Sequence, residues 1–399
     1  MFQFPRALRF TICIMSALLF VFFPFVRQVD AHAYSASYTT LNLTKSSTEM
    51  AYSLDELSVI ELVGGDINEN GMLEEEEFAA VKDQLLSLLQ QNITMKIGNV
   101  PEDWTHVESI NLTRQGDETK VVIKISFPPV PPSQPISLTD QLYINNTATA
   151  NYVDLLTINY GKQKSTSALS GKSRVWAMQM TDDEYADLHQ DAESLQLNSD
   201  SEQAAEQPNA VTEQSNTHSG WFSFFKLGIQ HILSGYDHLL FLFSLLIARQ
   251  TFKQYATMIT AFTIAHSITL TLTVLGWIDV PAELVEPAIA LSICFVAIDN
   301  MVRDRVNYRW VLTFLFGLVH GMGFADILKE MDIPRNELAV NLISFNLGIE
   351  TVQVIMIAVL LPLLALLHRW KYAKRAVYVS SSVALVLGGV WLVQRIWFN

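Results

Sequence analysis

Long apolar runs dominate the second half of the chain. An α-helix needs about 20 predominantly apolar residues to cross the hydrocarbon core of a bilayer, and six runs approach or exceed that length. The sequence therefore predicts a polytopic α-helical membrane bundle of about six helices over residues 220–399. We expect the membrane-spanning helices at residues 221–248, 255–276, 284–302, 310–328, 337–367 and 376–397.

Charge is distributed unevenly between the two halves of the chain. Residues 34–220 contain 28 Asp and Glu against 10 Lys and Arg, whereas residues 221–399 contain 11 and 13. A basic surface is the electrostatic signature of a nucleic-acid-binding protein, so the acidic first half argues against a nucleic-acid partner. The partner that the apolar second half predicts is the lipid bilayer.

The first 219 residues divide into three segments. Residues 1–33 have a basic start, an apolar core and the small-residue sequence AHA, which are typical of a secretory signal peptide; an uncleaved membrane anchor is the alternative. Residues 34–180 contain the runs SYTTLNLT, TKVVIKISF, QLYINN and YVDLLTINY, which predict an exported, mainly β, sandwich-like domain with a helical insertion. Residues 181–219 are acidic and poor in large apolar side chains, so we expect a disordered linker.

The loops between the predicted helices indicate the orientation of the bundle. Three alternate loops, RQTFKQ, RDRVNYR and HRWKYAKR, carry nine Lys and Arg, whereas WIDVPAE carries none and KEMDIPRN carries two. Positively charged loops remain in the cytoplasm. We therefore predict a multi-pass protein of the cell membrane whose N-terminal domain and C-terminus lie outside the cytoplasm.

Polar side chains interrupt four of the predicted helices at comparable depth. Ionisable groups are expensive in lipid and mark ion paths, proton relays or polar packing contacts. Imidazole and carboxylate ligands together suit nickel, cobalt, zinc or iron. A proton relay and a purely structural network are the alternatives. The metal-path hypothesis assigns the lining to His231, Asp237, His238, His266, His320, Asn346 and Glu350.

The spacing of the first two histidines restricts such a site. His231 and His238 are seven residues apart and share one helical face, but a straight helix separates them by roughly 10 Å. A bound ion needs each ligand nitrogen within about 2.1 Å of the ion itself. Either the helix unwinds at Gly235, or the two histidines serve successive positions on a path. Asp237 points to a different face, where we expect it to orient a histidine of a neighbouring helix.

Five motifs in this half resemble, in the same order, those of the HupE/UreJ family of membrane proteins, specifically its branch with an exported N-terminal domain. They are GIQHILSGYDHLLFL, FTIAHSITL, EPAIALS, FGLVHGMGFA and FNLGIE. The resemblance implies a secondary permease for nickel or cobalt, of the kind found near hydrogenase and urease genes. It also implies that His231, Asp237 and His238 match the family's His-x5-Asp-His metal signature. The better-described members have His-Pro where this chain has His231-Ile232. In the predicted fourth helix, this chain keeps only VHG of the family's motif.

A second motif lies in the predicted exported domain. The stretch DINENGMLEEEEF begins at Asp66 and fits the calcium-binding loop of an EF-hand over residues 66–77, with glycine at the sixth position and an amphipathic helix after it. An acidic turn before a helix is the alternative. The predicted calcium ligands are Asp66, Asn68, Asn70, the Met72 carbonyl group and Glu77.

Several functional classes are disfavoured by motifs that the sequence lacks. The chain has no G-x-x-x-x-G-K-[ST] phosphate loop and is not itself an ATPase. It has no H-E-x-x-H sequence, and only Cys294 remains outside the predicted leader, so a thiolate metal cluster is excluded. We therefore predict a permease and not an enzyme. The alternatives are a membrane metalloenzyme and a non-transporting assembly factor that recruits metalloenzyme maturation proteins.

Overall fold

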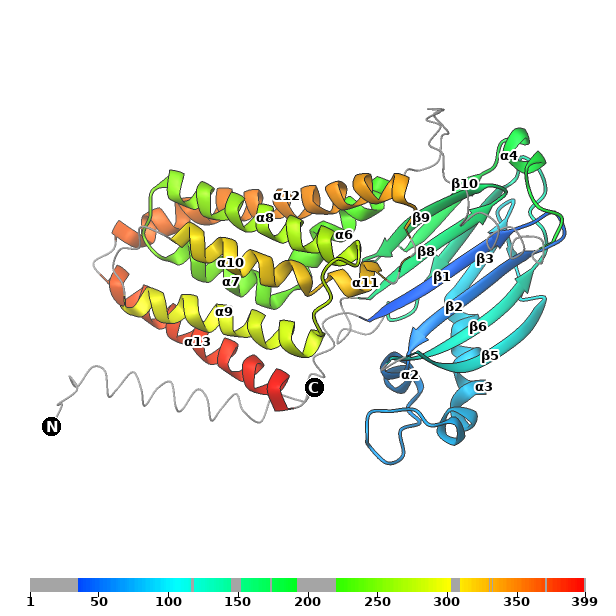
Figure 1. Cartoon of the computed structure of the whole chain (residues 1–399), viewed down its shortest axis with the longest axis horizontal. Coiled ribbons are helices and arrows are strands. Elements are labelled where there is room, and N and C mark those ends of the chain that lie inside the picture. The colour runs from blue at the N-terminus through cyan, green and yellow to red at the C-terminus, as the bar shows by residue number, and fades with distance from the viewer. Residues whose placement is uncertain are drawn as a thin grey trace. The chain divides into compact units, whose positions relative to one another are not determined.

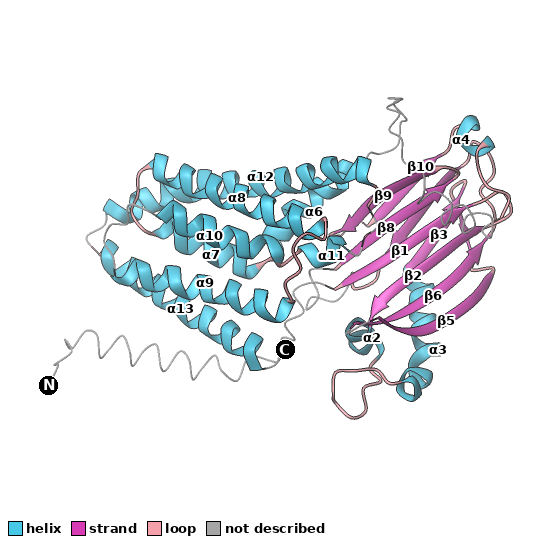
Figure 2. Cartoon of the chain, in the orientation of Figure 1, coloured by secondary structure: helices cyan, strands magenta, loops and turns pink. Residues whose placement is uncertain are grey.

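The structure is a computed structural model of the chain. It describes residues 35–115, 118–144, 152–172, 174–191, 220–302, 309–329, 331, 333–369 and 372–397. The predicted signal peptide, residues 1–33, and most of the predicted linker, residues 192–219, lie outside the described residues. The described chain consists of a strand-rich domain followed by a helical region (Figure 2).

The strand-rich domain is built from two sheets. The larger has the order β5-β6-β2-β1-β8-β9 and the smaller the order β10-β7-β3-β4. β1 pairs with β8 in parallel, and every other described pair is antiparallel, so the domain is a mixed β-sheet domain. The strands are β1 (Ala36–Leu43), β2 (Thr48–Asp55), β3 (Ile93–Ile97), β4 (Val100–Glu102), β5 (His106–Gln115), β6 (Glu118–Phe127), β7 (Pro135–Asp140), β8 (Val153–Tyr160), β9 (Gln163–Ser170) and β10 (Val175–Gln179).

Alternating side chains explain why these segments form strands. In β2 every second residue is buried, because successive side chains of a strand point to opposite faces of the sheet. Met50 and Tyr52 of the larger sheet and Met95 of the smaller one belong to the same apolar core. The predicted strand in QLYINN is wrong for its described residues, 141–144, which form a turn. Tyr143 has a φ of 60° there, a conformation that a strand does not allow.

A network of buried polar side chains crosses the core of this domain. Tyr152 donates a hydrogen bond of 2.5 Å to the Asp140 carboxylate. Ser37 and Thr39 both donate to Asp154 Oδ1, at 3.0 and 2.7 Å. Burial, reinforced by the negative charge of Asp140, raises the pKa of the Asp154 carboxyl from 3.8 to about 8. Asp154 is therefore mostly protonated in the folded domain at neutral pH.

The predicted helical insertion is present and comprises two helices, α2 (Glu56–Val63) and α3 (Glu75–Asn92). The Asp55 side chain caps α2 by accepting from the Ser58 N–H group. Glu74 and Glu77 form a capping box at the start of α3, which satisfies N–H groups that the first helical turn cannot pair. A third short helix, α4 (Asp182–Ala186), forms at the beginning of the predicted linker.

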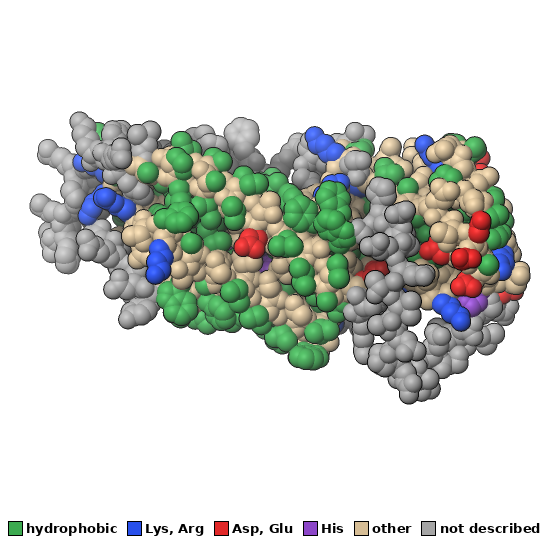
Figure 3. Space-filling model, turned by 90° about the horizontal axis from the view of Figure 1, so that it is seen from above, with side chains coloured by type: hydrophobic (Ala, Val, Ile, Leu, Met, Phe, Trp, Pro, Cys, Tyr) green, Lys and Arg blue, Asp and Glu red, His purple; other side chains and the backbone are tan. Residues whose placement is uncertain are grey.

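The helical region contains four helices that are long and apolar enough to cross a membrane, among the residues that the structure describes: Phe252–Val274, Ala282–Val302, Glu337–Ala365 and Ala373–Trp397. Apolar side chains spread over the outside of this region, whereas most acidic side chains visible on the same face gather on the strand-rich domain (Figure 3). The helices are α6 (Gly220–Ser234), α7 (Tyr236–Ile247), α8 (Phe252–Val274), α9 (Ala282–Val302), α10 (Arg309–Met322), α11 (Ala325–Lys329), α12 (Arg335–Arg369) and α13 (Ala373–Trp397) (Figure 1).

Two of the six predicted spans are not continuous helices. The predicted span at 221–248 divides into α6 and α7, and the predicted span at 310–328 divides into α10 and the short α11. Both breaks fall at glycine-containing segments: Gly235 separates α6 from α7, and Gly323 follows α10. Glycine opposes helix propagation because it loses the most backbone entropy on folding.

Glycines also allow close crossings between helices. A Cβ atom at Gly317 would lie 2.6 Å from the Phe262 carbonyl oxygen of α8, which is too close for any side chain. Gly228 of α6 and Gly348 of α12 face backbone atoms of the opposite helix in the same way. Small residues at such spacing bring helix backbones together in membranes. These crossings hold α6, α8, α10 and α12 around the polar residues described next.

Candidate metal site

The break at Gly235 brings the first two histidines together. α6 ends at Ser234 and α7 begins at Tyr236, with Gly235 between them in an extended conformation (φ −74°, ψ 91°). The ring centroids of His231 and His238 are 4.7 Å apart, although seven residues of a straight helix advance by roughly 10 Å along its axis. Of the two alternatives that the spacing left open, the structure has the one in which the helix is interrupted at Gly235.

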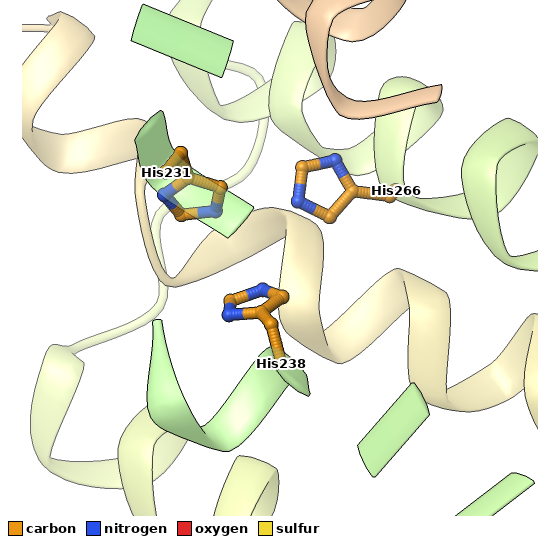
Figure 4. A group of neighbouring side chains, drawn as sticks. All are labelled: His231, His238 and His266. Carbon is orange, nitrogen blue, oxygen red and sulfur yellow. The ribbon is translucent and has the colours of Figure 1, made fainter. Parts of the chain in front are cut away.

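His266 of α8 completes a group of three histidines. Its ring centroid is 6.1 Å from that of His231 and 6.4 Å from that of His238. One nitrogen from each ring lies within 4.8 Å of the others, and all three residues are buried. The three rings point toward a common space between α6, α7 and α8 (Figure 4). A tetrahedral ion with bonds of about 2.1 Å would draw the nitrogens to about 3.4 Å from one another, so small side-chain rotations would close the site.

Nε2 of His238 is buried without a hydrogen bond to any described residue. The two ring nitrogens of His266 are buried as well, and the Asn346 side chain lies beside that ring. Buried polar atoms normally have partners, and a buried unsatisfied group costs about 1–3 kcal/mol. Neutral imidazole nitrogens are the ligands that late first-row transition metals favour. This chemistry fits a divalent metal ion.

Asp237 fixes the orientation of His238. Its Oδ1 accepts a hydrogen bond of 2.8 Å from the backbone N–H of His238 and lies 3.0 Å from Nδ1 of the same residue. A carboxylate can only accept, so Nδ1 carries the proton and Nε2 keeps its lone pair for an ion. The expectation that Asp237 orients a histidine of a neighbouring helix is wrong, because the break at Gly235 turns Asp237 toward its own neighbour in the chain.

His320 of α10 lies beside the group. Its ring centroid is 4.9 Å from that of His238. Ser292 Oγ donates to the Ile289 carbonyl at 2.6 Å and lies 3.0 Å from His320 Nε2. A hydroxyl group has one proton, so His320 donates from Nε2, and its Nδ1 lone pair is buried without a hydrogen bond to a described residue. Nδ1 of His320 can therefore serve as a fourth neutral nitrogen ligand for a metal ion, next to the three-histidine group.

Of the two residues of α12 that the metal-path hypothesis names, only Asn346 lies near the histidines. The Asn346 side chain lies beside the His266 ring. The structure does not bring Glu350 to the histidines: its side chain is exposed. Gln353, which the metal-path prediction omitted, is buried and accepts a hydrogen bond of 2.9 Å from Thr263.

Sequence reasoning also missed an arginine near the site. Arg395 of α13 lies 3.4 Å from Asp237 Oδ2 and 3.4 Å from Glu286 Oε2. The available signal was a single basic residue inside an otherwise apolar span of 376–397.

The predicted calcium loop folds as a compact turn. Asp66 accepts hydrogen bonds from the Asn70 and Gly71 N–H groups, at 3.1 and 2.8 Å. Glu77 accepts one from the Ile67 N–H group at 2.9 Å, and Asn68 directs its amide toward Glu74. The Met72 side chain is exposed. Calcium binding here stays a prediction.

Comparison with known proteins identifies the helical half of the chain. Residues 206–395 match the family described as HupE / UreJ protein. No curated protein matches the chain.

Proposed function

Residues 206–395 are a HupE/UreJ family domain, and we propose that this chain is a secondary permease for nickel or cobalt ions. The family is linked to nickel and cobalt uptake and is generally transporter-like. The single observation that carries the proposal is the buried group of His231, His238 and His266. A divalent ion in transit through a bundle must exchange its water ligands for protein ligands, and three neutral imidazoles supply them without adding net charge.

The arrangement around the histidines favours passage over permanent storage. His320 lies beside His238, with ring centroids 4.9 Å apart, and offers a further nitrogen ligand. In this proposal an ion passes from the three-histidine group to His320 in a short step.

The proposed direction of transport is inward. The membrane potential suffices as a driving force, because a doubly charged ion that enters across 100 mV gains roughly 4.6 kcal/mol. In this proposal α6 with α7, and α10 with α11, complete six crossings, and the strand-rich domain and the C-terminus face outside. Cysteines placed in the linker should react with an impermeant thiol reagent on intact cells, and cysteines in the loop 303–308 should not; the reverse pattern would contradict this topology.

Metal flux in reconstituted vesicles tests the function. The parent chain should accumulate Ni²⁺ or Co²⁺ when the vesicle interior is negative, and His231→Ala and His238→Ala should each abolish accumulation. Ser244→Ala is the matched control, because Ser244 lies on the same helix as His238, is buried, and has no hydrogen bond from its hydroxyl to a described residue. Absence of flux in the parent chain, with metal still bound, would favour a metalloenzyme or an assembly factor.

A further inference from the structure

Arg395, near the end of the last helix, reaches the carboxylate that orients His238. Its Nη2 is 3.4 Å from Asp237 Oδ2. Its Nε is 3.4 Å from Glu286 Oε2, and its Nη1 donates to the Glu286 carbonyl oxygen at 3.2 Å. The Arg395 side chain is only 10 % exposed. One guanidinium group thus joins α7, α9 and α13 beside the three-histidine group.

The two oxygens of Asp237 are engaged on opposite sides. Oδ1 holds the backbone and Nδ1 of His238, and Oδ2 faces Arg395. A carboxylate is planar, so fixing Oδ2 also fixes the direction in which Oδ1 accepts. The guanidinium fork is rigid and always charged, and a buried carboxylate without a compensating positive charge is strongly unfavourable.

We propose that Arg395 is a positioning residue for the metal ion, an inference that rests on the proposed function. Arg395 holds Asp237, Asp237 holds the Nδ1–H group of His238, and Nε2 of His238 then faces the ion. Arg395 itself does not touch the ion. The competing role is a purely structural one, in which the contact with Glu286 fastens α13 to α9 and the metal site is indifferent to it.

Cobalt binding by the purified full chain separates the two roles. Co²⁺ alone is the probe, and visible absorption reports its affinity and coordination. Arg395→Gln should weaken Co²⁺ binding by about 10–100-fold, the usual effect of losing a group that orients a ligand. Arg395→Lys, which keeps the charge, should recover part of the affinity. Arg375→Gln is the matched control, because Arg375 lies on the same helix, exposed and stacked on Tyr372, and it should bind as the parent does.

A double variant tests whether Arg395 acts through Asp237. If both belong to one chain of contacts, Arg395→Gln combined with Asp237→Asn should bind Co²⁺ no more weakly than the weaker single variant. Fully additive losses would overturn the inference, as would parent-like affinity in Arg395→Gln with only a lower melting temperature. If Arg395→Gln does not fold, Arg395→Lys decides: an altered cobalt spectrum with reduced affinity supports the inference, and a parent-like spectrum and affinity overturn it. A parent chain that binds no cobalt would overturn the proposed function as well.

Discussion

Gly235→Ala perturbs the metal site by a single methyl group. A Cβ at this position would lie 2.9 Å from the His231 carbonyl oxygen, 2.9 Å from His238 Nδ1 and 3.3 Å from Asp237 Oδ1. The Gly235 backbone, at φ −74° and ψ 91°, is accessible to alanine, so the effect comes from contact and not from backbone strain.

The size of the effect follows from these distances. Non-bonded heavy atoms settle at about 3.5 Å or more, so the His238 ring must move by roughly half an ångström or give up its bond to Asp237. Binding constellations must be held within about 0.5 Å of their working geometry. We therefore expect a loss of metal affinity of about 10–100-fold, comparable to the loss of an orienting partner. Stability should fall as well, because the His231 carbonyl oxygen, 2.9 Å from the new Cβ, belongs to the backbone and cannot rotate away as a side chain can.

A cobalt titration of the purified chain measures this loss. Gly389→Ala is the matched control, since a Cβ at Gly389 of α13 meets no atom within 4 Å. Gly389→Ala should melt at the parent temperature and bind cobalt as the parent does, whereas Gly235→Ala should stay folded at the temperature of the titration and bind cobalt weakly. Parent-like affinity in Gly235→Ala would refute the reasoning that the glycine is required by the His238–Asp237 pair.

Three further predictions concern other residues. The folded pKa of Asp154, about 8, lies above the ordinary 3.8, so the folded domain keeps a proton that the unfolded chain releases. The free energy of unfolding should therefore fall as pH rises from about 4 to 8. Hydrogen exchange of the β8 amides, corrected for intrinsic rates, measures this trend, and Asp154→Asn should remove much of it. Glu350→Gln should transport metal as the parent does, and a loss as large as that of His266→Gln would return Glu350 to the path. Calcium at a hundredfold excess over its dissociation constant should stabilise the full chain by about 2.7 kcal/mol and raise its melting temperature, but not that of Glu77→Gln; an unchanged parent favours the acidic turn.

The sequence predicts the histidines better than it predicts their partners. The seven-residue spacing of His231 and His238 indicates that a straight helix would place them too far apart for one ion. Gly235 between them indicates where the helix is interrupted. The partner of Asp237 depends on the direction in which α7 leaves the break, and no local pattern determines that direction. Arg395 lies 158 positions from Asp237, and their contact arises only when α13 packs on α9.

Helical periodicity was also too coarse for α12. Asn346 and Glu350 are one turn apart, yet only the first lies near His266. The buried centre of α12 runs through Phe345, Ile349 and Val352, so Asn346 and Glu350 lie at its margin. Four residues advance a helix by slightly more than one turn, which carries Glu350 out of the interface. In the strand-rich domain, alternation predicted β1, β6 and β8, but the positive φ of Tyr143 gives no signal in the sequence.

X-ray absorption at the metal edge of the purified chain, loaded with one equivalent of Ni²⁺ or Co²⁺, tests the central claim most directly. We predict nitrogen ligation at about 2.0–2.1 Å with the outer-shell scattering of about three imidazoles from the buried group, and loss of that imidazole scattering in the His231→Ala, His238→Ala double variant. A spectrum without imidazole scattering, or one that the double variant leaves unchanged, would contradict the assignment of His231, His238 and His266 as the metal site.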